Sequence, residues 1–149
     1  MILCALLPAV LFGLGRQPQT GRVIDSILGV SVGASFEESR ELLDRFGKGG
    51  ESEEEEREEA GEKMAWRFDS GEFTAIAVRA DDQGRVKWVT GFLRPGKERP
   101  FETIGDLKLG VSTQNEAIWN IRTGSSAYRV VAKGSNKRAS VMYLIRLSQ

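Results

Sequence analysis

The spacing of apolar residues changes along the chain, and the first clear change predicts a helix. Residues 36–46 carry apolar side chains at helical spacing, with charged residues at most of the other positions. Ser35 precedes this segment and Glu38 follows three positions later, which is the pattern of a helix N-cap. Gly47 comes directly after the last apolar residue and is expected to end the helix in the left-handed conformation. The apolar face consists of Phe36, Leu42, Leu43 and Phe46.

Five later segments alternate side chains with a period of two, which predicts strands. The short stretches between neighbouring strands are rich in Gly, Asp, Asn and Ser and predict tight turns, so we expect antiparallel meanders. The last segment is apolar on both faces, which predicts a central place in the sheet or cover on both sides. The predicted strands are residues 63–68, 72–80, 85–93, 125–132 and 138–147.

The helical segment has a fainter copy later in the chain. Residues 27–47 align without gaps with the residues 77 positions later. The matches fall at the glycine before the helix cap, at the cap and at the glycine that ends the helix. The copy predicts a second helix that is capped by Ser112 or Thr113 and ends at Gly124, with Trp119 at the edge of its buried face. That buried face is predicted to contain Ala117, Ile118 and Ile121. The superposed pairs are Ile27 with Ile104, Gly33 with Gly110, Ser35 with Ser112, Arg45 with Arg122, and Gly47 with Gly124.

Together these patterns predict an α+β fold of two tandem helix-plus-antiparallel-meander units, with the helices packed on one face of an antiparallel sheet. The first unit is predicted over residues 23–94 and a second, shorter unit over residues 101–149. The charged stretch 95–100 contains Pro and Gly and is the predicted linker between them.

Residues 1–15 have the layout of a secretory signal peptide. Residues 2–14 form an apolar run that is too short to span a bilayer comfortably, and Gly13 and Gly15 offer small residues before a cleavage point. No basic residue precedes the run. Residues 16–22 are a predicted polar tether. We therefore expect an extracytoplasmic protein, periplasmic or secreted, that is membrane-associated only if this segment stays uncleaved.

Charge is unevenly distributed, although the chain has a net charge of zero. Residues 51–63 hold eight glutamates against Arg57 and Lys63, a net charge of −6 that the rest of the chain balances. Dense like charges repel and bury no apolar surface, so an acidic, solvated insert is predicted over residues 48–63. A weak Ca²⁺ site or a contact for a basic partner is the alternative, but the alternating Asp or Asn positions of a calcium loop are missing.

The residue types that carry much of catalysis and metal binding are scarce. Histidine is absent, and Cys4, inside the predicted signal peptide, is the one cysteine. The commonest general base and a Cys-based zinc site are therefore excluded. Asp81 and Asp82 are adjacent carboxylates, but they precede Gly84 in a predicted turn, where Asp is expected for turn chemistry alone. We expect a protein that is not an enzyme and uses no metal or cofactor.

Three stretches of the first unit carry a resemblance. They are Gly33–Gly47 (GASFEESRELLDRFG), Trp66–Phe68 (WRF) and Gly84–Gly91 (GRVKWVTG). In this order they resemble the BamE/SmpA/OmlA-like domains of outer-membrane assembly lipoproteins, and two such units in tandem are similar to the beta-lactamase-inhibitor-protein fold. The resemblance implies that the sheet or its edge loops bind other proteins. The small residues of a lipoprotein cleavage site do not precede Cys4, and the acidic insert has no counterpart in the family.

Aromatic residues on the predicted strands are the candidates for such a surface, because Trp and Tyr often anchor protein contacts. Trp88 and Tyr143 fit an exposed face best, whereas Trp66 and Phe92 also fit a buried core. The predicted function is a protein-binding or scaffold domain of the cell envelope that contacts another envelope or secreted protein, and not nucleic acid. An inhibitor-like secreted protein and a membrane-tethered envelope domain are the alternatives. The predicted partner-binding residues are Trp88, Tyr143, Trp66, Tyr128, Arg67 and Lys87.

Overall fold

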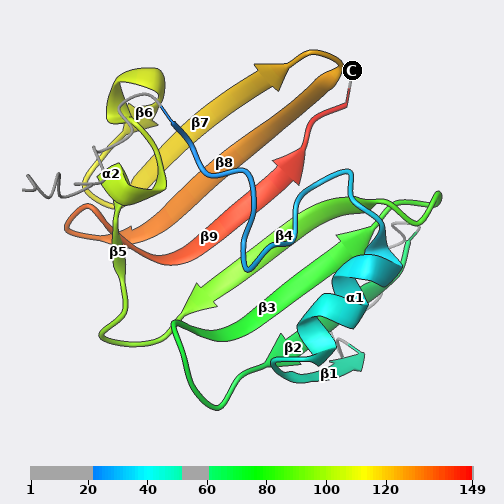
Figure 1. The fold of residues 1–149 in the computed structure, drawn as a ribbon. Coiled ribbons are helices and arrows are strands. Elements are labelled where there is room, and N and C mark those ends of the chain that lie inside the picture. Colours follow the sequence, from blue (N-terminus) through cyan, green and yellow to red (C-terminus); the bar gives the residue numbers. More distant parts are fainter. Residues whose placement is uncertain (1–21, 52–60, 149) are drawn as a thin grey trace, which may run out of the picture.

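An antiparallel sheet dominates the computed structural model, which describes residues 22–51 and 61–148 (Figure 1). In the described part of the chain the sheet has nine strands, in the order β1-β2-β3-β4-β9-β8-β7-β6, and the short β5 pairs with one end of β9. The strands are β1 (Lys48–Glu51), β2 (Lys63–Arg67), β3 (Phe73–Ala80), β4 (Val86–Leu93), β5 (Arg99–Pro100), β6 (Val111–Ser112), β7 (Glu116–Thr123), β8 (Ser126–Ser135) and β9 (Arg138–Arg146). The helical elements are α1 (Phe36–Asp44), the short α2 (Phe101–Ile104) and the 3₁₀ turn η1 (Leu107–Leu109).

The five predicted strands are confirmed as β2, β3, β4, β8 and β9. Strands β2–β4 form one meander and β7–β9 form another, and the two meet through antiparallel pairing of β4 with β9. The central position predicted for the last strand is confirmed, because β9 lies between β4 and β8. Turn geometry fixes the β8–β9 register, since Asn136 and Lys137 both have positive φ, as a two-residue hairpin loop requires.

The predicted tandem architecture is wrong, and the error lies in the second half of the chain. The segment predicted as the second helix, residues 112–124, contains the end of β6 and the whole of β7. The fold of the described residues is therefore mostly antiparallel sheet, and it is not built from two tandem units with helices packed on one face. The linker predicted over residues 95–100 contains β5, which is hydrogen-bonded into the same sheet.

The physical reason is that β7 follows a period of two and not of 3.6. Ala117 and Trp119 are fully buried, while Ile118 between them is only half-buried and Asn120 is exposed. Ile and Trp favour a pleated, half-buried surface. Thr113, one of the two predicted helix caps, accepts hydrogen bonds from the backbone N–H groups of Asn115 and Glu116 in the turn between β6 and β7.

The helix α1 forms where it is predicted, with differences at its end. The hydroxyl of Ser35 accepts a hydrogen bond from the backbone N–H of Glu38 at 3.4 Å, so the predicted cap is confirmed. Phe46, predicted to share the buried face, lies beyond the helix and is 63% exposed. Gly47 does not take the left-handed conformation; an added Cβ there would lie 2.7 Å from the ring of Phe68, so close packing explains the glycine.

The core lies on one side of the sheet. Helix α1, the N-terminal segment 22–35 and α2 all pack on this side, as Figure 1 shows. The segment 22–35 comes close to the strands because Gly91 of β4 has no side chain: an added Cβ would lie 3.0 Å from a methyl group of Ile27. The buried residues that these elements contribute include Val23, Ile27, Val30, Phe36, Leu43, Phe101 and Ile104.

Two fully buried indoles anchor the outer strands to this core. Trp66 of β2 donates its indole N–H to a carboxylate oxygen of Asp44 at 2.7 Å, at the end of α1. Trp119 of β7 donates its indole N–H to the backbone oxygen of Asp106 at 2.8 Å. Each buried indole therefore has the partner that it needs, because an unpaired N–H in an apolar core is costly.

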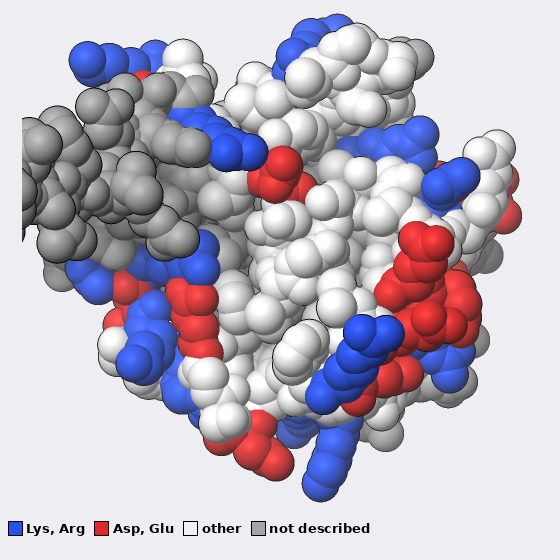
Figure 2. Space-filling model, in the orientation of Figure 1, with Lys and Arg blue, Asp and Glu red and all other residues white. Residues whose placement is uncertain are grey.

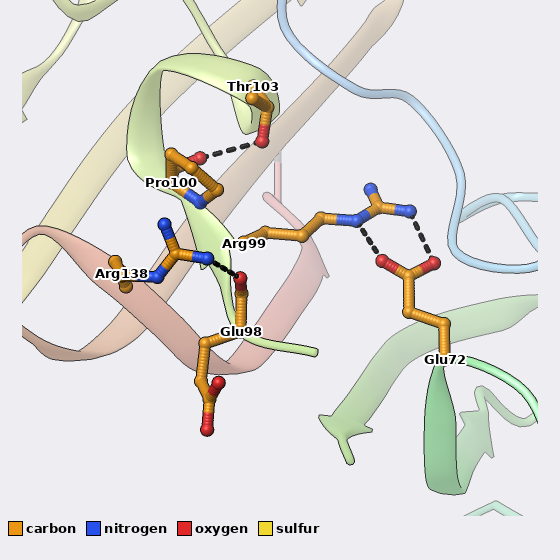
Figure 3. A network of polar contacts seen from close by, with 6 residues as sticks. All are labelled: Glu72, Glu98, Arg99, Pro100, Thr103 and Arg138. Carbon is orange, nitrogen blue, oxygen red and sulfur yellow. Dashed lines mark hydrogen bonds and ion pairs between the residues drawn. The ribbon is translucent and has the colours of Figure 1, made fainter. Parts of the chain in front are cut away.

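The connection between the two meanders is held by a polar network (Figure 3). The guanidinium of Arg99 makes a bidentate ion pair with Glu72, which lies just before β3, and its second bond measures 2.7 Å. Arg138 of β9 donates to the backbone oxygen of Glu98 at 2.6 Å, and the Thr103 hydroxyl donates to the backbone oxygen of Pro100 at 2.7 Å. The network ties the segment before α2 to both halves of the sheet.

Removal of the Arg99–Glu72 pair is expected to destabilise the fold. We predict that Arg99→Ala lowers the free energy of unfolding by about 1 kcal/mol, because a charge-assisted bidentate pair that is only one-third exposed outweighs a surface ion pair. Arg99→Lys should recover only part of the loss, since an ammonium group cannot make both bonds. Urea unfolding monitored by tryptophan fluorescence measures this, with the exposed Lys97→Ala as the matched control. Equal stabilities of the Arg99→Ala and Lys97→Ala variants would show that the pair is dispensable.

Candidate interaction surface

The side of the sheet that faces away from α1 is called the open face here, and its composition follows from strand register. Residues directly opposite each other on antiparallel strands point to the same face. The register pairs Trp88, Thr90 and Phe92 of β4 with Ile145, Tyr143 and Val141 of β9, in that order. The core residues of these two strands, such as Val89 and Leu144, alternate with them and point to the other side.

An apolar ridge runs along the middle of the open face, over the junction of the two meanders. Trp88 is 37% exposed and Phe92 is 40% exposed, although both lie on a central strand. The rings of Trp88 and Tyr143 contact each other with centroids 6.3 Å apart and planes tilted by 52°. Within the described residues, α1, α2 and the segment 22–35 all lie on the opposite side (Figure 1). The apolar ridge consists of Trp88, Phe92, Val141, Tyr143 and Ile145.

Exposed basic residues lie on both sides of the apolar ridge, and they are called the basic flanks. Lys48 of β1 and Arg67 of β2 lie opposite each other in the strand register. Arg122, Arg129 and Lys133 lie on β7 and β8, at register positions that share the open face. All five are exposed in the structure.

The open face carries only one acidic side chain among its described strand positions. This is Glu116, whose carboxylate lies 3.2 Å from the ammonium group of Lys133. Arg129 donates to the amide oxygen of Asn120 at 2.8 Å, so its partner is neutral. Lys63 and Arg79 also occupy positions of this face, opposite each other on β2 and β3.

The opposite side of the molecule is acidic around α1. Helix α1 presents Glu37, Glu38, Glu41 and Asp44 against a single Arg40. Figure 2 views the molecule from this side, and acidic side chains gather where α1 lies. A chain of zero net charge is therefore polarised within its described part, with basic side chains on the open face and acidic ones over α1.

The structure brings together three of the six predicted partner-binding residues. Trp88, Tyr143 and Arg67 share the open face. Trp66 is a fully buried core residue on the other side of the sheet. Tyr128 and Lys87 also lie away from the apolar ridge, where they line a cleft at one end of the sheet.

Phe92 was expected to fit a buried core, but it is exposed, and a β-bulge explains the difference. The expected alternation placed Val86, Trp88 and Phe92 on one face of the strand. The pairing of β3 with β4 shifts register between Arg79 and Ala80, which places the fully buried Val86 opposite Ala80. A bulge of this kind reverses the face of the residues beyond it. The even spacing of Trp88 and Phe92 already placed the two rings on one face, so the exposed position predicted for Trp88 was the available signal for an exposed Phe92.

The cleft at the end of the sheet is polar and has a volume of about 1040 Å³. Asp81 closes one side of it: one carboxylate oxygen accepts from the backbone N–H groups of Gln83 and Arg85, both at 2.9 Å, and the other pairs with Arg146 at 3.1 Å. The N–H of Arg85, helped by the N–H of Gln83 and the charge of Arg146, holds the pKa of Asp81 below its usual value despite some desolvation. These bonds satisfy the carboxylate within the turn, which gives it a structural role.

Tyr128 lines the same cleft and is half-buried. Burial raises the pKa of its hydroxyl above the usual value, and the negative charge of Asp25 adds to that effect, while Arg22 opposes it. A phenol with a raised pKa stays neutral at physiological pH, so it can donate a hydrogen bond but does not serve as a base there. The cleft therefore offers hydrogen-bonding groups, among them the neutral phenol of Tyr128.

Residues 22–51 and 61–148 contain neither a candidate metal site nor a membrane-spanning helix. No grouping of three or more Asp, Glu, His or Cys side chains suits a metal ion within those ranges. None of the described helices is both long and apolar enough to cross a membrane. The predicted signal peptide and most of the acidic insert lie outside the described residues. No family model, no curated protein and no solved structure matches the chain.

The lowered pKa of Asp81 predicts a pH-dependent contribution to stability. A carboxylate whose pKa is lowered by folding stabilises the fold above its unfolded pKa of about 3.9, and this contribution is lost as pH falls through the lower folded value. We predict that Asp81→Asn removes part of the acid sensitivity, so that wild type and variant converge in stability at the acid end. Urea unfolding at several pH values from about 2 to 7 tests this, with Asp82→Asn in the same turn as the control for loss of one charge. Parallel pH profiles for wild type and Asp81→Asn would contradict it.

Proposed function

We propose that this chain is an exported, non-enzymatic protein-binding domain of the cell envelope that contacts its partner through the open face. The observation that carries the proposal is the exposed apolar ridge, above all Trp88 and Phe92 in the middle of the sheet. Large apolar side chains clustered on an otherwise solvated surface are typical of interaction sites. Trp and Tyr, which the ridge supplies at its centre, are the side chains most often found as binding anchors.

The free energy that would be gained by covering the apolar ridge supports the proposal of a partner. Trp88 and Phe92 each leave more than a third of their surface in water, so covering them is worth roughly 1 kcal/mol per ring from apolar burial alone. Val141, Tyr143 and Ile145 lie beside them on β9 and are half-buried, so the same partner would cover them as well. The backbone of both strands is already paired on each side, which leaves side chains to supply the contact.

The cellular location is part of the proposal and rests on residues 1–15, whose apolar run and small residues at Gly13 and Gly15 have the layout of a signal peptide. The kinship with BamE/SmpA/OmlA-like domains also stays a prediction. Helix α1 precedes the meander β2–β4, as the resemblance implies, but the short β1 lies between them, and the second half has a strand where a second copy would place its helix.

The mature N-terminus tests export directly. We predict that intact-mass spectrometry of the protein recovered from its native cells gives a chain that begins after Gly15, because small residues precede that point. An intact Met1 recovered in the membrane fraction would favour the membrane-tethered domain over the cleaved, exported protein. An intact Met1 in the soluble cytoplasmic fraction would contradict export altogether.

Photo-crosslinking tests the open face with a matched pair of positions. Phe92 and Phe46 are both exposed phenylalanines, at 40% and 63%, and Phe46 follows α1 on the opposite side. We predict that a benzoylphenylalanine at position 92 crosslinks to one saturable protein partner in the native cells, and that the same probe at position 46 does not.

The second arm of this experiment adds Trp88→Ala to the chain that carries the probe at position 92. Loss of a central aromatic anchor should lower the crosslink yield about tenfold or more, in line with a cost above 1.4 kcal/mol. Thermal unfolding of the variant confirms that it still folds, which is expected because Trp88 lies outside the core. Equal yields from positions 92 and 46, or a yield that Trp88→Ala leaves unchanged, would sink the proposed function.

A further inference from the structure

We propose that the partner surface is an acidic protein surface, with carboxylates placed around an apolar centre. This inference rests on the proposed function, and it adds the chemistry of the occupant. The apolar ridge alone would fit many partners. The basic flanks narrow the choice, because an apolar centre with a charged rim is met best by an apolar centre with a rim of the opposite sign.

The charge arrangement is the observation that carries the inference. Lys48 and Arg67 lie on one side of the apolar ridge, and Arg122, Arg129 and Lys133 lie on the other. All five are exposed, so their stems and charged groups are accessible from the direction in which a partner would approach. Glu116 is the one carboxylate on the described strands of this face. The described strand positions of this face are therefore mostly basic, although the chain as a whole is neutral.

The arrangement disfavours a second copy docked face to face. A two-fold axis through the apolar ridge would bring each basic flank against a basic flank of the other copy, whichever way the axis runs in the plane of the sheet. Like charges held together cost free energy, and the single Glu116 per copy cannot offset five basic residues. The acidic α1 of another copy could meet the open face only head to tail, and the experiment below detects that arrangement.

The ridge also differs from a platform for single-stranded nucleic acid. Such platforms lay aromatic rings flat so that successive bases stack on them. Here the rings of Trp88 and Tyr143 pack against each other at 52°, and the neighbouring positions are filled by Val141, Ile145 and the half-buried Ala77. Branched aliphatic side chains complement an apolar protein surface better than a phosphate backbone.

Charge reversal on the flanks tests the inference with the crosslinking probe at position 92. We expect Arg67→Glu and Arg129→Glu, one on each flank, to lower the crosslink yield about five- to tenfold each, because reversal turns an attraction into a repulsion. Arg67→Gln and Arg129→Gln should have smaller effects of the same sign. Lys97→Glu and Lys108→Glu are the matched controls, since both are exposed lysines outside the open face, and they should change the yield less than twofold.

Salt and the identity of the crosslinked product complete the test. The wild-type yield should fall as ionic strength rises from about 50 to 300 mM, because exposed charges are screened over shorter distances. The partner peptides that carry the crosslink, located by mass spectrometry, should be rich in Asp and Glu.

The outcomes separate this inference from the proposed function. A protein crosslink that survives both reversals and high salt overturns the acidic partner and leaves the open-face binding function standing. A nuclease-sensitive product, or a crosslink between two copies of this chain, overturns the inference in favour of nucleic acid or self-assembly. Absence of any crosslink from position 92 contradicts the proposed function itself.

Discussion

The pairing of β4 with β9 is the interaction on which the rest of the structure depends. It joins the meander β2–β4 to the meander β7–β9 through five consecutive cross-strand pairs, from Trp88–Ile145 to Phe92–Val141. The two strands lie far apart in sequence, so the chain closes a long loop before this contact forms, and the pairing must offset that loss of entropy. Arg99, Glu72, Glu98 and Arg138 strengthen the same junction from its side, by tying the connection between the meanders to both of them.

The same pairing sets which side chains of β4 and β9 lie on each face of the sheet. On one face, Val89 and Leu144 belong to the core that α1, α2 and the segment 22–35 cover. On the other face, Trp88 and Tyr143 come into contact only because their strands are neighbours. Because residues 116–123 form β7, the segment adds a strand to the sheet and supplies no second long helix to cover it. A wide sheet with cover on one side leaves apolar side chains in water on the other, and this is the exposure that the proposed partner would remove.

Charged side chains are distributed unequally between the two sides of the sheet. The basic residues of β1, β2, β7 and β8 lie at the flanks, and the acidic residues of α1 lie on the opposite side. Under the proposed function, this separation of charge among the described residues would orient an approaching acidic surface before the apolar contact forms. The polar cleft around Asp81 and Tyr128 lies apart from this arrangement, and its carboxylate is satisfied by the turn that it stabilises.

Local sequence patterns were enough to locate one helix and several strands. The period-of-two pattern located β2, β3, β4, β8 and β9, and the Ser35 cap located the start of α1, because capping and alternation depend on neighbours a few residues away. The same local patterns marked Trp88 and Tyr143 as candidates for an exposed face. The prediction that Phe46 shares the buried face of the helix was wrong, because the helix ends before this residue and its ring lies in solvent.

Other features depend on contacts that local patterns do not reveal. Whether Thr113 begins a helix or a turn into β7 depends on the pairing of β7 with β8 in a hairpin, which outweighs the weak preference of a cap. The bulge beside Ala80 decided that Phe92 faces outward, and the burial of Trp66 depended on Asp44, which lies 22 positions earlier in the chain. The open face exists because strands distant in sequence pair in one register, and a contact between distant strands leaves no periodic signal in either of them.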